Sequence, residues 1–195
     1  MTSEETQKYV SVVEQLSGLK AVNKGVPGGC LAPDGFGNGS LKKAVLDLED
    51  GKENADLITL EVLPNEGAKV GNIYDVDDES FCGCLNQCIR FLQEKTAAQI
   101  VVIVMISSNT NPPELPSKKR GIPQYEFAEI IEKVARLNSV PVINAFTNSG
   151  FGYARVKNKE YQVDNIHLND LGGINMGKFI WSKLKNIPDW QGVDL

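Results

Sequence analysis

The chain has 195 residues, a length that suits one domain, and its composition of 42% hydrophobic and 23% charged residues is typical of a globular protein with a sizeable core. The formal net charge is −5. The nearest approach to a basic cluster is Ser117 to Arg120, so we expect no nucleic-acid partner, because such proteins present a basic face. No stretch approaches the about 18 apolar residues of a membrane span, so no membrane partner is expected either.

In chain order, short apolar runs, which predict strands, alternate with segments whose apolar residues have the period of an amphipathic helix. Helices are expected over 4–18, 41–50, 77–96, 124–138 and 170–186, and strands over 19–25, 55–63, 99–106 and 140–146. A Gly/Pro-rich loop covers 25–40. The run 99–106 is apolar almost throughout, which is typical of a strand buried on both faces of a parallel sheet.

Strand followed by helix, repeated along the whole chain, predicts a single α/β domain over 1–195: a doubly wound parallel sheet with helices on both faces. Ligands in such folds bind at the carboxyl ends of the strands. Four loops fall there by topology: 25–29, 64–67, 107–111 and the loop that carries His167, the one histidine of the chain.

Cysteines at positions 30, 82, 84 and 88 do not have the spacing of a zinc site, and no second histidine is present to complete one. Cys84 and Cys88 lie one helical turn apart. We therefore expect buried free thiols, no metal and no disulfide scaffold.

Four residues on the predicted ligand edge of the sheet suggest acyl-transfer chemistry. Gly28 offers a backbone N–H, Asn65 offers a side-chain amide, and Asp164 and His167 supply an acid and a base three residues apart. Each feature also has an ordinary interpretation, since Gly and Asn dominate turns and a histidine can cap the helix that follows it.

The order of these features resembles the SGNH hydrolase superfamily, also called GDSL-type esterases and lipases. "VNKGVPGGCLA" is similar to its second block, "ADLITLEVLPNEG" to its third and "VDNIHLNDLGG" to its fifth. The resemblance implies that Gly28 and Asn65 form an oxyanion hole and that Asp164 and His167 are the acid and base of a catalytic triad. It implies the flavodoxin-like SGNH fold, no cofactor, and a small-molecule or carbohydrate acyl ester as substrate.

Two departures from the family pattern stand out. The third block reads Leu63-Pro64-Asn65-Glu66, and the first block, Gly-Asp-Ser, which carries the nucleophilic serine on the first strand, is not found. Met1 and Thr2 fit the tail of that block, so we expect the serine and the central strand to be absent from the chain as given. The gap should be filled by a further N-terminal segment or by a second copy, or the sheet should close up to four strands.

Two other residues, Ser3 and Cys30, are candidate nucleophiles. Ser3 has no preceding strand to present it and is better placed near the start of the first helix. Cys30, directly after the glycine pair, would need an exposed, electropositive setting.

Three functions remain open. The leading one is a GDSL-type ester hydrolase acting on acyl or acetyl esters. The alternative is a catalytically inactive SGNH-fold domain that binds acyl or carbohydrate ligands. A nucleotide-binding domain ranks last, because the glycine-rich loop lacks both G-x-G-x-x-G and a phosphate-clamping Lys-Ser/Thr pair. The oligomeric state stays open, and a homo-oligomer is possible. The compartment stays open too, because no signal peptide occurs but the chain need not begin where the natural domain begins.

Overall fold

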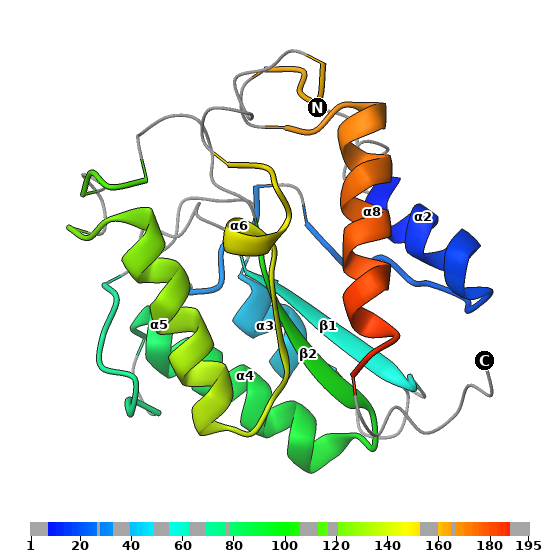
Figure 1. Cartoon of the computed structure of the whole chain (residues 1–195). Helices are drawn as coiled ribbons and strands as arrows, with labels where there is room; N and C mark the ends of the chain where they lie inside the picture. The colour runs from blue at the N-terminus through cyan, green and yellow to red at the C-terminus, as the bar shows by residue number, and fades with distance from the viewer. Residues whose placement is uncertain are drawn as a thin grey trace.

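The computed structural model describes residues 8–26, 28–32, 40–48, 55–62, 69–76, 79–105, 113–116, 121–152, 160–164 and 167–187. Within them, one parallel sheet of three strands has the order β1-β2-β3 and carries helices on both faces (Figure 1). The strands are β1 (Leu57–Val62), β2 (Gln99–Val104) and β3 (Val142–Asn144). The predicted class, a single α/β domain with a doubly wound parallel sheet, is confirmed.

The middle strand β2 is the centre of the core. All its residues except the first are buried, because the strand has a neighbour on each edge and helices over each face. Its register pairs Val102 with Leu60 of β1 on one side and with Val142 of β3 on the other. The apolar run that predicted a doubly buried strand is therefore correctly assigned.

Two separate hydrophobic clusters show which helices cover which face of the sheet. One joins Leu60 and Val102 to α4 (Phe81–Lys95), α5 (Gln124–Leu137) and α3 (Leu41–Leu46). The other joins Val101 and Ile103 to α8 (Asp170–Leu184), with α2 (Lys8–Ser17) packed beside it. Figure 1 shows α2 and α8 together on one side of the sheet and α3, α4 and α5 on the other.

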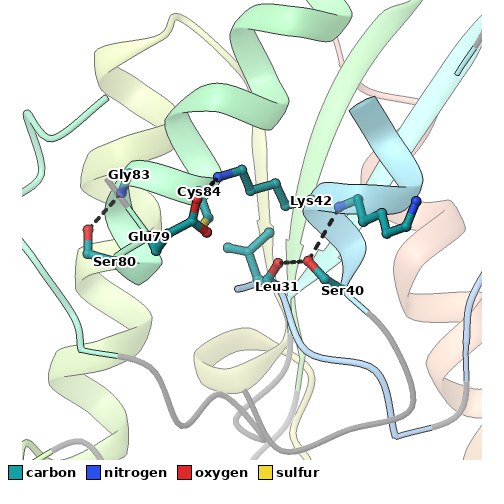
Figure 2. A network of polar contacts seen from close by, with 8 residues as sticks. Leu31, Ser40, Lys42, Glu79, Ser80, Gly83 and Cys84 are labelled. Atoms are coloured by element: carbon teal, nitrogen blue, oxygen red, sulfur yellow. Dashed lines mark hydrogen bonds and ion pairs between the residues drawn. The ribbon is translucent and has the colours of Figure 1, made fainter. Parts of the chain in front are cut away.

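Serine caps set the starts of the two helices α3 and α4. Ser40 Oγ accepts the N–H of Lys43, and Ser80 Oγ accepts the N–H of Gly83 at 3.1 Å. Figure 2 shows how the two starts are joined: Lys42 Nζ donates to Glu79 Oε1 at 2.7 Å, across from α3 to the residue ahead of α4. This ion pair links the start of α3 to the start of α4.

The four cysteines are buried free thiols, as predicted. Three of them lie in α4, and Cys30 follows the Gly28–Gly29 turn. Burial raises the pKa of the Cys88 thiol to about 12, with a smaller contribution from Cys84 and a partly opposing one from Lys42. These side chains serve as small apolar groups of the core.

The strand predicted over 19–25 is not observed, since residues 18–26 have no regular structure. A parallel strand needs a neighbour to pair with, and no strand of the described residues lies beside this segment. The sheet therefore has three strands in the described part of the chain, and the four-stranded sheet that was one of the three alternatives is not observed there.

The last predicted strand, 140–146, is also shorter than expected. It ends at Asn144, whose side chain caps the four-residue helix α6 (Ala145–Asn148) by accepting the N–H of Thr147 at 2.9 Å. An asparagine favours helix starts over strand interiors. Across the residues that the structure describes, no helix is both long and apolar enough to span a bilayer.

Candidate active site

The only histidine lies in a short hairpin directly before α8. An antiparallel bridge pairs Gln162 with Leu168, and Val163 N–H donates to His167 O at 2.9 Å. The hairpin sits close against the helix because Gly172 has no side chain: a Cβ there would stand 2.3 Å from Tyr161 O. The glycine pair noted in the sequence thus lets the histidine loop pack onto the first turn of α8.

Asp164 orients His167 through three hydrogen bonds. The ring Nδ1 lies 2.7 Å from Asp164 Oδ2 and 2.9 Å from Oδ1, and Oδ1 also accepts the backbone N–H of His167 at 2.9 Å. The side chain of His167 is 38% exposed and that of Asp164 is 48% exposed. The expected hydrogen bond between the two residues through one ring nitrogen is therefore present.

The second ring nitrogen, Nε2, has no hydrogen-bond partner among the described residues. A carboxylate at Nδ1 favours the tautomer with the proton on Nδ1, which leaves Nε2 with a lone pair. An imidazole held in this way on a partly exposed loop can accept a proton at Nε2 and release it again.

The alternative in which His167 caps the last helix is not supported. The cap is Asn169, whose Oδ1 accepts the N–H of Gly172 at 3.0 Å. The same side chain donates from Nδ2 to Glu160 O at 2.7 Å, so Asn169 ties the hairpin to the helix. Asn169 was not predicted as the cap from the sequence, although an Asn directly before an acidic residue and an apolar helix is a common capping pattern.

The two predicted oxyanion-hole residues are not both within the described chain. Gly28 lies in a turn that Gly29 N–H closes onto Val26 O at 2.9 Å, and its φ of +71° favours glycine. Asn65 lies outside the described residues, as does Ser3. The convergence of Gly28, Asn65 and His167 stays a prediction.

Cys30 has the setting of a structural thiol. It is 5% exposed, and its residue forms an isolated parallel bridge with Ser40. A reactive thiol needs an accessible, electropositive environment, so burial favours the structural interpretation of Cys30 over the nucleophilic one.

A small apolar cavity lies where β1 and β2 end. Its volume is about 10 Å³, and its walls include Val62, Val104, Met105, Phe127 and Phe146. The carboxyl ends of strands are where open α/β sheets bind ligands. A space of this size takes no more than a small group such as a methyl.

Two further polar features were not foreseen from the sequence. Gln162 is 4% exposed, and within the described part of the chain neither its Oε1 nor its Nε2 has a hydrogen-bond partner. On the same side of the sheet as α2, the Tyr9 hydroxyl makes a short hydrogen bond to Glu61 of β1, and burial raises the pKa of both groups. From the sequence, only the alternation of side chains along β1 could have predicted that Glu61 faces a helix.

Comparisons with known proteins give information on the fold alone. Neither protein-family models nor curated proteins match the chain. Among solved structures, it is similar to a protein from Lactobacillus plantarum with a TM-score of 0.74 and 18% identity, over 91% of this chain and 86% of that chain. It is also similar to "a possible lipase" from Chitinophaga pinensis, with a TM-score of 0.63 and 16% identity over 93% and 91% of the two chains.

A peptidoglycan O-acetylesterase matches 67% of this chain and 37% of its own, with a TM-score of 0.50 and 21% identity. At such identities the likeness shows the fold alone. The chain thus shares the α/β fold of these structures, with three parallel strands and flanking helices in its described part.

Proposed function

We propose that this domain belongs to an ester hydrolase of the SGNH type, with His167 as the general base and Asp164 as the residue that orients it. The observation that carries the proposal is the one-sided binding of the imidazole. Asp164 holds Nδ1 at 2.7 Å, while no described residue hydrogen-bonds Nε2. The esterase- and lipase-like folds of the similar structures support the same reaction class.

The chemistry follows from that arrangement. A serine hydroxyl near Nε2 attacks the acyl carbon, and its proton moves to Nε2 as the new C–O bond forms. The tetrahedral intermediate then expels the alcohol oxygen, which takes the proton from Nε2. Water repeats the two steps on the acyl-enzyme. Asp164 stabilises the imidazolium at each stage, and Gly28 and Asn65 are proposed to donate to the oxyanion.

The nucleophile of this proposal lies outside the described residues, because no described serine hydrogen-bonds His167. Following the family resemblance, we propose a small acyl ester or an O-acetylated carbohydrate as the substrate class.

The test is labelling of the protein, expressed from its native gene, with a fluorophosphonate that reacts with activated serines. A label that maps to one serine and is lost in His167→Ala supports the hydrolase. Failure to label any serine, together with binding of acetylated sugars in a titration, supports the catalytically inactive binding domain instead. The second candidate is favoured by one observation, the absence of a hydroxyl partner for His167 among the described residues.

A further inference from the structure

A single amide, the side chain of Asn169, bonds both the hairpin that carries His167 and the helix α8. Asn169 Nδ2 donates to Glu160 O at 2.7 Å, and Asn169 Oδ1 accepts the N–H of Gly172 at 3.0 Å. The backbone N–H of Asn169 also donates to Tyr161 O at 3.0 Å. Glu160 and Tyr161 begin the hairpin, and Gly172 lies in the first turn of α8. The Asn169 amide therefore connects the base of the hairpin to the start of the helix.

The inner face of the hairpin is formed by Gln162 and Leu168, which lie opposite each other. Successive residues of a strand point to opposite faces, so Gln162 is 4% exposed and its neighbour Val163 is 59% exposed. Within the described residues, Gln162 supplies no side-chain hydrogen bond from this inner face. Leu168 packs there by apolar contact, which is non-directional. That packing by itself does not fix the angle between the hairpin and α8.

The angle between the hairpin and α8 sets where the His167 ring points. Asp164 holds the ring Nδ1 from within the same hairpin, so the acid and the base move together. His167 is two residues from Asn169, a separation of about 7 Å in an extended chain. A rotation of about 10° at Asn169 would therefore move the ring by about 1 Å, and a displacement of that size can lower a turnover rate about 100-fold.

We propose that Asn169 is a positioning residue, which aims Nε2 of His167 by fixing the angle of the hairpin against α8. The inference rests on the proposed function, because that function makes His167 the general base. The two polar atoms of the amide have separate roles: Oδ1 caps the helix, and Nδ2 holds the hairpin. A helix cap needs the acceptor alone, so the Nδ2 bond is the contact on which the reaction depends.

The substitution Asn169→Ser separates the two roles. Serine keeps an acceptor for the N–H of Gly172 and is a favoured cap, but it has no amide to donate to Glu160 O. The matched control is Asn144→Ser, because Asn144 likewise caps a helix, α6, and donates from Nδ2 to Glu132 at 2.7 Å. Should Asn169→Ser not fold, Asn169→Asp also keeps the acceptor and lacks the donor.

Residual dipolar couplings of backbone N–H groups, measured by NMR, report the angle between the hairpin and α8. In Asn169→Ser, the couplings of Val163 and His167 should no longer fit the wild-type orientation when the couplings of α8 serve as the reference. The nitrogen chemical shifts of the ring should still show the proton on Nδ1, because its carboxylate partner is unchanged. In Asn144→Ser, the hairpin couplings should equal those of the wild type. Unchanged hairpin couplings in Asn169→Ser overturn the proposal.

Labelling by the fluorophosphonate connects this angle to the reaction. In the protein expressed from its native gene, the rate of serine labelling should fall about 10- to 100-fold in Asn169→Ser and stay within about twofold of the wild type in Asn144→Ser. An unchanged labelling rate together with changed hairpin couplings would also overturn the positioning role. If the wild type is not labelled at all, the proposed function fails, and the couplings still decide whether Asn169 fixes the hairpin.

Discussion

The carboxylate of Asp164 holds His167 at two points, the ring Nδ1 and the backbone N–H. The backbone contact fixes the turn and does not involve the ring. The ring contact fixes the tautomer and orientation of the imidazole. The same carboxylate thus orients the ring for catalysis and stabilises the local fold, through contacts to different atoms of His167. Substitutions can separate these two roles.

Replacing His167 with Ala should remove catalysis and leave the fold intact. In a hydrolytically competent form we expect turnover to fall by about three to six orders of magnitude, the scale of triad removals. The free energy of unfolding should change little, because the side chain is partly exposed and the bond from residue 167 N–H to Asp164 remains. Turnover and urea unfolding, measured on the same preparations, check both expectations.

The matched control is Asp164→Asn, which keeps an oxygen for the backbone N–H but can present an NH₂ donor to Nδ1. The wrong tautomer should lower turnover by about four orders of magnitude. Equal turnover in the wild type and Asp164→Asn would contradict the assigned roles of both residues.

The 195-residue chain by itself should show no serine-dependent hydrolysis of nitrophenyl acetate. The physical reason is that no described hydroxyl contacts His167. Release of nitrophenol over the buffer rate is the measurement, with Cys30→Ala as the control for thiol reactivity. Activity that survives Cys30→Ala and disappears in Ser3→Ala would identify Ser3 as the nucleophile and refute our interpretation of the N-terminal residues.

Cys88 should make the protein less stable at alkaline pH. Burial raises the pKa of its thiol from 9.0 to about 12 in the folded state. Between these values the unfolded chain has lost a proton that the folded protein keeps, so the free energy of unfolding should fall with rising pH. The slope from one group approaches about 1.4 kcal/mol per pH unit.

Urea unfolding of the wild type and Cys88→Ala from pH 8 to 11 measures this slope. The difference in the free energy of unfolding between the two proteins isolates the contribution of Cys88, because lysines and tyrosines also titrate in that range in both proteins. At pH 8 the free energy of unfolding of Cys88→Ala should be about 1 kcal/mol lower than that of the wild type, because packing is lost. As the pH rises, the two free energies should approach each other. Parallel curves would show that the thiol is accessible to water in the folded protein.

Gly177 should tolerate no side chain where α8 meets α2. A Cβ at this position would lie 2.6 Å from Val12 Cβ and 3.0 Å from Tyr9 O. We expect Gly177→Ala to lower the free energy of unfolding by about 1–3 kcal/mol, as overpacking does, despite the better helix propensity of alanine.

A double-mutant cycle with Val12→Ala provides the control. Val12→Ala removes Val12 Cγ1, which would lie 2.7 Å from the new Cβ, but keeps Val12 Cβ and Tyr9 O in place, so rescue should be partial. Strictly additive effects of the two substitutions would mean that α2 does not pack on α8 at Gly177.

The sequence predicted well what depends on local pattern and burial. The doubly buried strand β2 and the helices α4 and α5 follow from apolar periodicity, and the pairing of Asp164 with His167 follows from their spacing. The segment 19–25 has the composition of a strand but no partner in the described chain, and pairing depends on residues far away in sequence. Asn169 could have been predicted as a helix cap from its position before α8, whereas only the folded hairpin shows that the Gln162 amide is buried.

The acid–base pair is assembled almost entirely from near neighbours. The contacts between Asp164 and His167 span three residues, and the hydrogen bonds of the Asn169 side chain to Gly172 and Glu160 span three and nine residues. Contacts so close in sequence form quickly and cost little loop entropy. The pair can therefore form before the long-range pairing of the sheet is complete, and the stretch from Glu160 to Gly173, with the helix behind it, is a portable unit that could be grafted onto another helix start.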